Sequence, residues 1–205
     1  RYQLPAFIND LRIRWRQGYL PFYFVQLPNN GKKPVNPTVE DFWSVLRESQ
    51  MLALRVPNTG MVVSIDIGDG DLHPKNKKPF GERLAALALH HIYKNNITSE
   101  GPLLNEVRVN GDTIVVSFHH AGRGLVFNSD SAKGFAIAGD DRRFYWASAS
   151  ISNNTVKVYS PWVKNPKAVR YAWGENPDFS LFNSEGWPAS PFRTDDWQLR
   201  EDGRW

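Results

Sequence analysis

The sequence of 205 residues predicts an α/β protein in two parts: the C-terminal half of a parallel-sheet α/β domain over residues 1–100, and a small all-β sandwich-like domain over residues 101–205. In the first part, segments of helical and strand periodicity alternate, as in parallel strands joined by helices. In the second part, short alternating segments are separated by turn residues, which indicates antiparallel structure. The first part has two predicted strands, whereas such a sheet usually has about five, so we expect only half of that sheet here.

The elements of the first part follow from periodicity and from signals at the helix starts. Apolar residues recur at helical spacing from Leu4 to Trp15. Thr38, with Asp41 three residues later, resembles a helix-capping pair. The sequence predicts helices over 4–15, from Thr38 through about Leu54 and over 80–92, and buried strands over 21–28 and 60–67.

The second part reads as short strands separated by the turn sequences NG, GDD and SNN. Strands are predicted over 113–118, 143–149, 155–160 and 168–173. The segment NSEGWPASPFRTDDW (183–197) is rich in Pro and aromatic residues and lacks periodicity. We expect it to be an ordered loop that packs back on the body.

The composition excludes several classes of site and partner. No cysteine is present, which excludes disulfides, thiolate metal sites and cysteine nucleophiles. The net charge of +4 is dispersed, and the longest basic cluster is KNKK at 75–78, so we expect no nucleic-acid partner. No apolar run approaches the length of a membrane span, so we expect none.

Three aspartates and a histidine follow the second predicted strand: Asp66, Asp69, Asp71 and His73. Ligands of open α/β sheets bind at the carboxyl ends of the strands, so this loop is the expected place for a site. A calcium loop, a zinc site and a phosphate loop each lack required residues, and we expect no metal and no cofactor. An ordinary acidic scaffold loop remains an alternative to a histidine general base that a carboxylate orients.

No nucleophile accompanies this histidine in the sequence. There is no G-x-S-x-G turn, and Ser44, Ser49 and Ser64 lie in helix or strand patterns without a glycine turn. The histidines at 90–91 and 119–120 are interpreted as helix-end and strand-end residues. A base without a nucleophile is half of a hydrolytic site.

The stretch DIGDGDLHPKNKKPFGERLA resembles the histidine-bearing block of the sialate O-acetylesterase-like group of SGNH hydrolases. Three further stretches agree in order: FINDLRIRWRQGYLPFYFVQLPN, FWSVLRESQMLALRVPNTGMVVSID and VKNPKAVRYAWGENPDFSLFNSEGWPASPFRTDDW. Together these stretches cover most of the chain. The resemblance implies a serine carbohydrate esterase with a flavodoxin-like (SGNH) parallel-sheet domain and an accessory β-domain.

On this resemblance His73 is the catalytic base and Asp71 is the acid of the triad. Asp66, Asp69 or a backbone carbonyl are the alternative partners of the histidine. Many members place an aspartate three residues before the histidine, where this sequence has Gly70.

The family's nucleophilic serine and oxyanion-hole residues precede the stretches matched here. The resemblance therefore implies that the N-terminal part of the same enzyme is a partner of this chain and that the isolated chain is inactive. Gln50 and Arg193 match family positions to which the sequence assigns no role.

The implied function is the removal of O-acetyl groups from an acetylated sugar or glycan, as in a sialic acid 9-O-acetylesterase, by a secreted or periplasmic protein. An alternative esterase would act on acetylxylan or another hemicellulose. An alternative of a different class is a non-catalytic carbohydrate-binding module, because Trp146, Trp162, Trp173 and Trp187 suit a sugar platform. The strand alternation favours tryptophans that pack in the core or tail.

Overall fold

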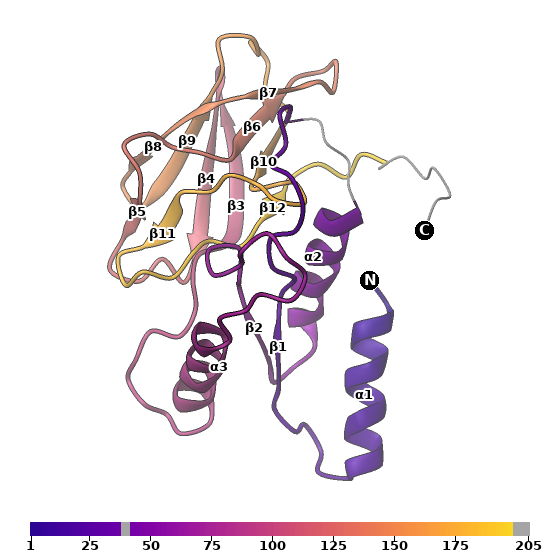
Figure 1. Cartoon of the computed structure of the whole chain (residues 1–205). Helices are drawn as coiled ribbons and strands as arrows, with labels where there is room; N and C mark the ends of the chain where they lie inside the picture. The colour runs from indigo at the N-terminus through magenta and orange to yellow at the C-terminus, as the bar shows by residue number, and fades with distance from the viewer. Residues whose placement is uncertain (38–41, 199–205) are drawn as a thin grey trace.

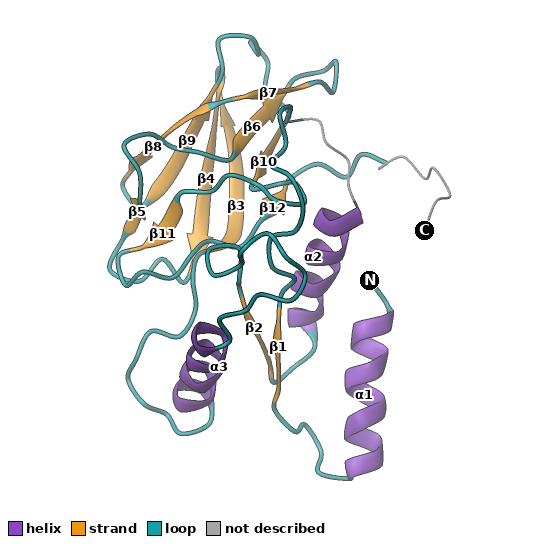
Figure 2. Ribbon diagram, viewed as in Figure 1, coloured by secondary structure: helices purple, strands orange, loops and turns teal. Residues whose placement is uncertain are grey.

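The computed structural model describes residues 1–37 and 42–198, and these form a mixed α/β fold (Figures 1 and 2). Helices and a small parallel sheet come first, and an antiparallel β region follows. The elements in these ranges are α1 (Gln3–Trp15), β1 (Phe22–Val25), α2 (Phe42–Leu52), η1 (Ala53–Arg55), β2 (Thr59–Val62), α3 (Lys78–His91), β3 (Leu103–Asn110), β4 (Thr113–His119), β5 (Leu125–Phe127), β6 (Phe135–Ala138), β7 (Phe144–Trp146), β8 (Ser148–Ser152), β9 (Thr155–Tyr159), β10 (Ala168–Tyr171), β11 (Leu181–Asn183) and β12 (Phe192–Arg193).

The strands β1 and β2 pair in parallel, with Phe22 opposite Thr59, which confirms the predicted parallel pairing. Successive side chains of a strand point to opposite faces of its sheet. Tyr23 lies toward α3, with its ring 6.3 Å from that of His91, whereas Phe22 lies toward α1, with its ring 6.1 Å from that of Phe7. Helix α3 therefore covers one face of the pair, and α1 and α2 lie on the other side (Figure 1).

A buried arginine, Arg12, bonds helix α1 to two neighbouring turns. The Arg12 guanidinium donates to the carbonyl of Leu20 at 2.9 Å, of Pro57 at 2.8 Å and of Asn58 at 3.2 Å. These bonds join the helix to the turns that precede β1 and β2. Apolar side chains on the outer side of α1 remain exposed.

The β region consists of antiparallel sheets, as expected, and two of them share one apolar core. One four-stranded sheet has the order β3-β4-β9-β8, another has the order β12-β10-β6-β7, and β11 pairs with β5. Ile114 and Val158 of the first sheet share one core with Ile137 of the second. That core also contains Met61 of β2 and Ile65 from the segment after it, so one apolar cluster runs through both predicted parts. The division between residues 100 and 101 stays a prediction, as does a flavodoxin-like half-domain.

Several strands differ from the sequence-based expectations. Strands β3, β5, β6, β11 and β12 were not expected, because they are short, polar or uniformly apolar and lack clean alternation. The strand predicted over 60–67 ends at Val62, because the N–H groups of Ile67 and Gly68 both turn back to the carbonyl of Ser64. The strand predicted over 143–149 is interrupted at Ala147, between β7 and β8. The predicted cap at Thr38 lies outside the described residues.

The segment 183–197 packs back on the body, which confirms the expectation for it. Part of it is more regular than expected, because β12 pairs with β10 and places Arg193 opposite Arg170. Arg170 forms a buried ion pair with Asp195 at 2.8 Å. Arg193 donates to Glu48 of α2 at 2.7 Å, which joins this segment to the helical part.

Candidate active site

Asp66 is an anchor for helix α3. Its two carboxylate oxygens accept bonds from the Arg83 guanidinium at 2.7 and 2.5 Å, and both side chains are largely buried. Arg83 also donates to the carbonyl of Val63 at 2.7 Å. This pair therefore fixes the start of α3 against the carboxyl end of β2, and both Asp66 oxygens are committed to it.

Asp69 closes the loop that follows. Its Oδ1 accepts the Asp71 N–H at 3.3 Å, and its Oδ2 accepts the Lys75 N–H at 3.1 Å. The bond from Lys75, with that from Asp71, lowers the pKa of the Asp69 carboxyl below its ordinary value. Asp69 is therefore ionised at neutral pH, and both of its oxygens bind backbone.

Asp71 lies two residues before His73 and bonds to its backbone. Asp71 Oδ1 accepts the His73 N–H at 2.9 Å. Within the described residues, Asp71 Oδ2 accepts no hydrogen bond, in contrast to all four carboxylate oxygens of Asp66 and Asp69. In the part of the chain that the structure describes, Asp71 is the one of the three aspartates with an oxygen that accepts no hydrogen bond.

His73 is exposed, and the following Pro74 is buried. No hydrogen bond from the described part of the chain reaches the imidazole ring. The ring can therefore accept a proton from a group that approaches from outside. The structure brings His73 and Asp71 together through the backbone, and their catalytic assignment stays a prediction.

The loops after the two parallel strands lie against each other. The Gly31 N–H donates to the Gly70 carbonyl at 3.1 Å, and Gly70 has a φ of +84°, which favours glycine. A Cβ on Gly68 would lie only 3.0 Å from the backbone nitrogen of Asn29. The glycines of this acidic loop therefore permit the close approach that holds it in place.

A buried arginine in α2 joins these loops to the β region. The Arg47 guanidinium donates to the carbonyls of Leu27 at 2.9 Å, Pro28 at 2.6 Å, Gly174 at 2.6 Å and Glu175 at 3.0 Å. Sequence reasoning missed Arg47, because nothing in the FWSVLRESQ pattern distinguishes it from a surface arginine. Through Arg47, the β region thereby supports the segment that follows the carboxyl end of β1.

Gln50 and Arg193, to which the sequence assigns no role, both make structural contacts. Gln50 accepts the Leu27 N–H at 2.9 Å and donates to the Val25 carbonyl at 3.1 Å, at the carboxyl end of β1. Arg193 forms the ion pair with Glu48 that joins the end of the chain to α2. Within the described residues, neither side chain is hydrogen-bonded to His73.

The serines considered as nucleophiles are unsuitable where the structure places them. Ser44 and Ser64 are buried, and Ser64 Oγ donates to the Gln26 carbonyl at 2.6 Å. Ser49 Oγ donates to the Val45 carbonyl of its own helix at 2.8 Å. In the described ranges, no serine bonds to the histidine of the acidic loop.

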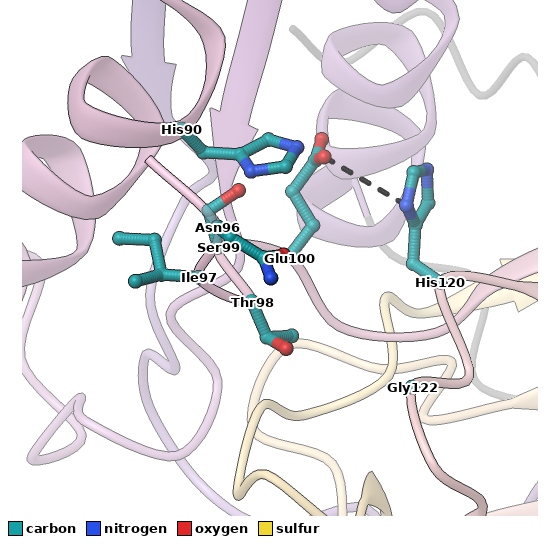
Figure 3. Close-up of a pocket in the computed structure, with 8 residues that line it drawn as sticks. All are labelled: His90, Asn96, Ile97, Thr98, Ser99, Glu100, His120 and Gly122. Atoms are coloured by element: carbon teal, nitrogen blue, oxygen red, sulfur yellow. Dashed lines mark ion pairs between the residues drawn. The ribbon is translucent and has the colours of Figure 1, made fainter. Parts of the chain in front are cut away.

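A polar pocket of about 310 Å³ lies at the other end of α3, lined by His90, Glu100 and His120 among others (Figure 3). Glu100 Oε2 lies 3.1 Å from Nε2 of His91 and 3.7 Å from Nδ1 of His120. A helix of 14 residues is about 21 Å long, so this pocket is remote from His73. Sequence reasoning missed this cluster because its members are distant in the chain.

The described part of the chain contains no group of three His, Asp or Glu side chains that could hold a metal ion. In the same ranges, no helix is long and apolar enough to cross a membrane.

The four tryptophans considered as a sugar platform do not share one environment. Trp173 is buried between two guanidinium groups, with Arg170 5.2 Å and Arg193 5.4 Å from its ring. Trp187 lies under the Arg83 guanidinium at 5.5 Å. Trp146 and Trp162 are exposed. Two of the four are therefore packing residues, as the alternation favoured.

No protein-family model matches the chain, and no curated protein matches it. Among solved structures, the chain is similar to a crystal structure described as that of a novel carbohydrate acetylesterase from Xanthomonas citri. The two share 40% sequence identity with a TM-score of 0.86, over 95% of this chain and 46% of that chain. This chain therefore spans about half the length of the protein that it resembles.

Proposed function

We propose that this chain is the base-bearing part of a carbohydrate esterase that removes O-acetyl groups from sugars. The observation that carries the proposal is the similarity, at 40% identity over 95% of this chain, to a carbohydrate acetylesterase. The exposed imidazole of His73 at the carboxyl end of a parallel strand supports it.

In the proposed reaction, a serine from the part of the enzyme that this chain lacks attacks the acetyl carbonyl. His73 accepts the serine proton and then donates it to the sugar oxygen that leaves, which forms an acetyl-enzyme and a free hydroxyl. His73 next deprotonates a water molecule that attacks the acetyl-enzyme, which yields acetate and restores the serine. The tetrahedral oxyanions are stabilised by donors of the missing part.

Asp71 is the proposed partner of the imidazole, because its Oδ2 is not committed to another bond among the described residues. A carboxylate in this place would hold one tautomer of His73 and stabilise the imidazolium. The isolated chain is proposed to be inactive, since the serines that we considered are buried or bonded to backbone.

The proposed substrate is a sialic acid-like sugar carrying a 9-O-acetyl group, and acetylxylan is the alternative. To distinguish these two substrates, acetate release from 9-O-acetylated sialic acid is compared with acetate release from acetylxylan at equal acetyl concentration. The same resemblance carries the proposal of a secreted or periplasmic location, which fractionation of the native cells tests.

The decisive test compares His73→Ala with His119→Ala in the complete enzyme, this chain together with its serine-bearing part. Both histidines are exposed, but only His73 lies in the acidic loop. We expect acetate release to fall by about 10²- to 10⁴-fold for His73→Ala and to remain unchanged for His119→Ala. Undiminished release by His73→Ala, with glycan binding retained by this chain alone, would instead support a carbohydrate-binding module.

A further inference from the structure

The polar pocket at the end of α3 is lined by three segments of the chain. His90 belongs to the last turn of α3, residues 96–100 precede β3, and His120 follows β4. The pocket therefore lies where the helical part meets the β region. Its volume of about 310 Å³ is at the lower end of the range for small-molecule sites, which is about 300–1,000 Å³.

One buried amide fixes two of these segments relative to each other. Asn183 of β11 is buried, and its Nδ2 donates to the Glu100 carbonyl at 3.0 Å and to the His120 carbonyl at 3.2 Å. Its Oδ1 accepts the Trp187 N–H at 2.9 Å. His120 has a φ of +56°, a left-handed conformation that costs free energy for a residue with a side chain. The surrounding bonds therefore hold the walls of the pocket in a defined shape.

The Glu100 carboxylate is held in place and keeps one oxygen unbound. Its Oε2 accepts a hydrogen bond from Nε2 of His91 at 3.1 Å and lies 3.7 Å from Nδ1 of His120. Within the described residues, no hydrogen bond reaches Glu100 Oε1. In Figure 3 this carboxylate lies between the rings of His90 and His120. Because the Glu100 side chain is only 15% exposed, a ligand hydroxyl would bond there to an ionised acceptor largely removed from water, which makes a strong bond.

The other polar groups that line the pocket offer both donors and acceptors. His90 Nδ1 lies 3.2 Å from the Asn95 carbonyl oxygen. A carbonyl only accepts, so Nδ1 carries the proton and Nε2 of the neutral ring is an acceptor. The Asn96 amide and the Thr98 hydroxyl can each donate and accept. The lining therefore suits a ligand whose groups also do both.

The charges of the pocket disfavour ions as ligands. No lysine or arginine is among the described residues that line it, so an anion would face the Glu100 carboxylate without a cation to offset it. A metal ion is disfavoured because the described ranges contain no group of three suitable ligands. The N–H and O–H donors of the lining oppose any other cation. A neutral ligand with several hydroxyl groups fits this set of groups.

We propose that this pocket binds one neutral sugar residue through its hydroxyl groups. The hydroxyls donate to Glu100 Oε1 and His90 Nε2 and accept from Asn96 and Thr98. The site does not rest on the proposed function, because none of its residues takes part in the proposed ester hydrolysis. It also differs from the tryptophan platform, since no tryptophan lines the described part of the pocket and the sugar is held by hydroxyls rather than by its apolar face.

The test titrates the isotopically labelled chain with xylose, glucose, galactose and N-acetylneuraminic acid, and follows the backbone amides by NMR. We expect at least one neutral sugar to cause saturable shifts at residues 96–100, His120 and Gly122. N-acetylneuraminic acid, whose carboxylate would approach Glu100, should bind at least about tenfold more weakly. Shifts that are absent for all three neutral sugars, or that are confined to other amides, would overturn the proposal. So would equal affinity for the anionic sugar.

Variants test the role of the carboxylate. Glu100→Gln should raise the Kd for the neutral sugar at least about tenfold, because the acceptor loses its charge. The matched control is Glu106→Gln, which changes an exposed carboxylate in β3 and should leave the Kd unchanged. Equal affinity of the two variants would overturn the proposal. If Glu100→Gln does not fold, exposed Asn96 decides: Asn96→Ala should weaken binding relative to Asn105→Ala, which is also exposed, and equal binding rejects the site.

The titration uses this chain alone and sugars without acetyl groups, so its result is independent of acetate release. Failure to bind a neutral sugar rejects the pocket and leaves the esterase proposal as it stands. Loss of the esterase proposal, through undiminished acetate release by His73→Ala, likewise leaves the pocket as it stands.

Discussion

Asp71 Oδ1 accepts the backbone N–H of His73 at 2.9 Å, so this carboxylate fixes the residue through its main chain. Both oxygens of Asp66 and both of Asp69 are bound elsewhere, to Arg83 and to backbone N–H groups. Within the described residues, the second oxygen of Asp71 accepts no hydrogen bond. Of the three aspartates, Asp71 is therefore the one whose replacement should affect His73 most directly.

Asp71→Asn should lower kcat for acetate release by about 10⁴-fold, as loss of the triad carboxylate does elsewhere. Asparagine retains an acceptor for the His73 N–H, so the turn is preserved while the charge is removed. Steady-state kinetics of the complete enzyme measures the effect. Full activity of Asp71→Asn would reduce Asp71 to a turn residue and return the role to Asp66, Asp69 or a backbone carbonyl.

Asp66→Ala should destabilise the fold by about 3 kcal/mol, because it leaves the largely buried Arg83 guanidinium without its counter-charge. The double variant Asp66→Ala with Arg83→Met should be less destabilised than the single one, since no buried charge remains. Urea unfolding monitored by tryptophan fluorescence measures both values. A single variant as stable as the unchanged chain contradicts this anchoring role.

Stability should fall in acid partly through Glu48. Burial alone would raise the pKa of the Glu48 carboxyl, but the hydrogen bonds and charges of Arg193 and Arg1 outweigh it and hold the pKa below its ordinary value. A depressed carboxyl pKa stabilises the folded state above the unfolded pKa, and this contribution disappears as the pH falls through the folded pKa. The unchanged chain should exceed Glu48→Gln in stability by about 2 kcal/mol at pH 7.

Thermal unfolding of the unchanged chain and of Glu48→Gln, measured from pH 7 to pH 3, tests whether the contribution of Glu48 to stability is lost in acid. The difference between their melting temperatures should begin to shrink as the pH falls through the pKa of the unfolded carboxyl and should vanish only below the lower pKa of the folded protein. A difference that stays constant down to pH 3 would show that the charge of Glu48 contributes nothing.

Tyr171→Phe should cost about 1–3 kcal/mol of folding stability. The Tyr171 hydroxyl accepts the N–H groups of Leu181 at 2.9 Å and of Ser180 at 3.2 Å, and burial raises its pKa well above the ordinary value. Phenylalanine fills the same volume and leaves two buried donors without an acceptor. Tyr159→Phe, on an exposed side chain, is the matched control and should be neutral in the same urea titration.

Periodicity was a reliable guide where one face of an element is buried. It located α1 and α3 within two residues or so at each end and placed β4 and β9 closely. It failed for β6, whose four residues are all buried because the tail covers the second face of its sheet. Such a strand has no polar face, so alternation cannot identify it.

The position of the acidic loop after a strand of the parallel pair was predictable, whereas the bonding partners of its side chains were not; the role of the loop as a site stays a prediction. The carboxyl end of a buried strand marks a site in open sheets, and His73 follows from that rule. The roles of the aspartates depend on which backbone N–H each one reaches, and that depends on how the loop turns at Gly70. Arg83 and Arg47 belong to the site's support, but their partners lie 17 to 128 residues away.

The four carbonyl bonds of Arg47 have a consequence for the order in which the protein is made. Two of its acceptors, at Leu27 and Pro28, are synthesised before it, whereas Gly174 and Glu175 follow 127 and 128 residues later. Closing so long a loop is slow compared with forming a helix. During synthesis, the guanidinium of Arg47 can therefore reach its last two acceptors only after the chain has passed β10, long after the residues of α2 have been made.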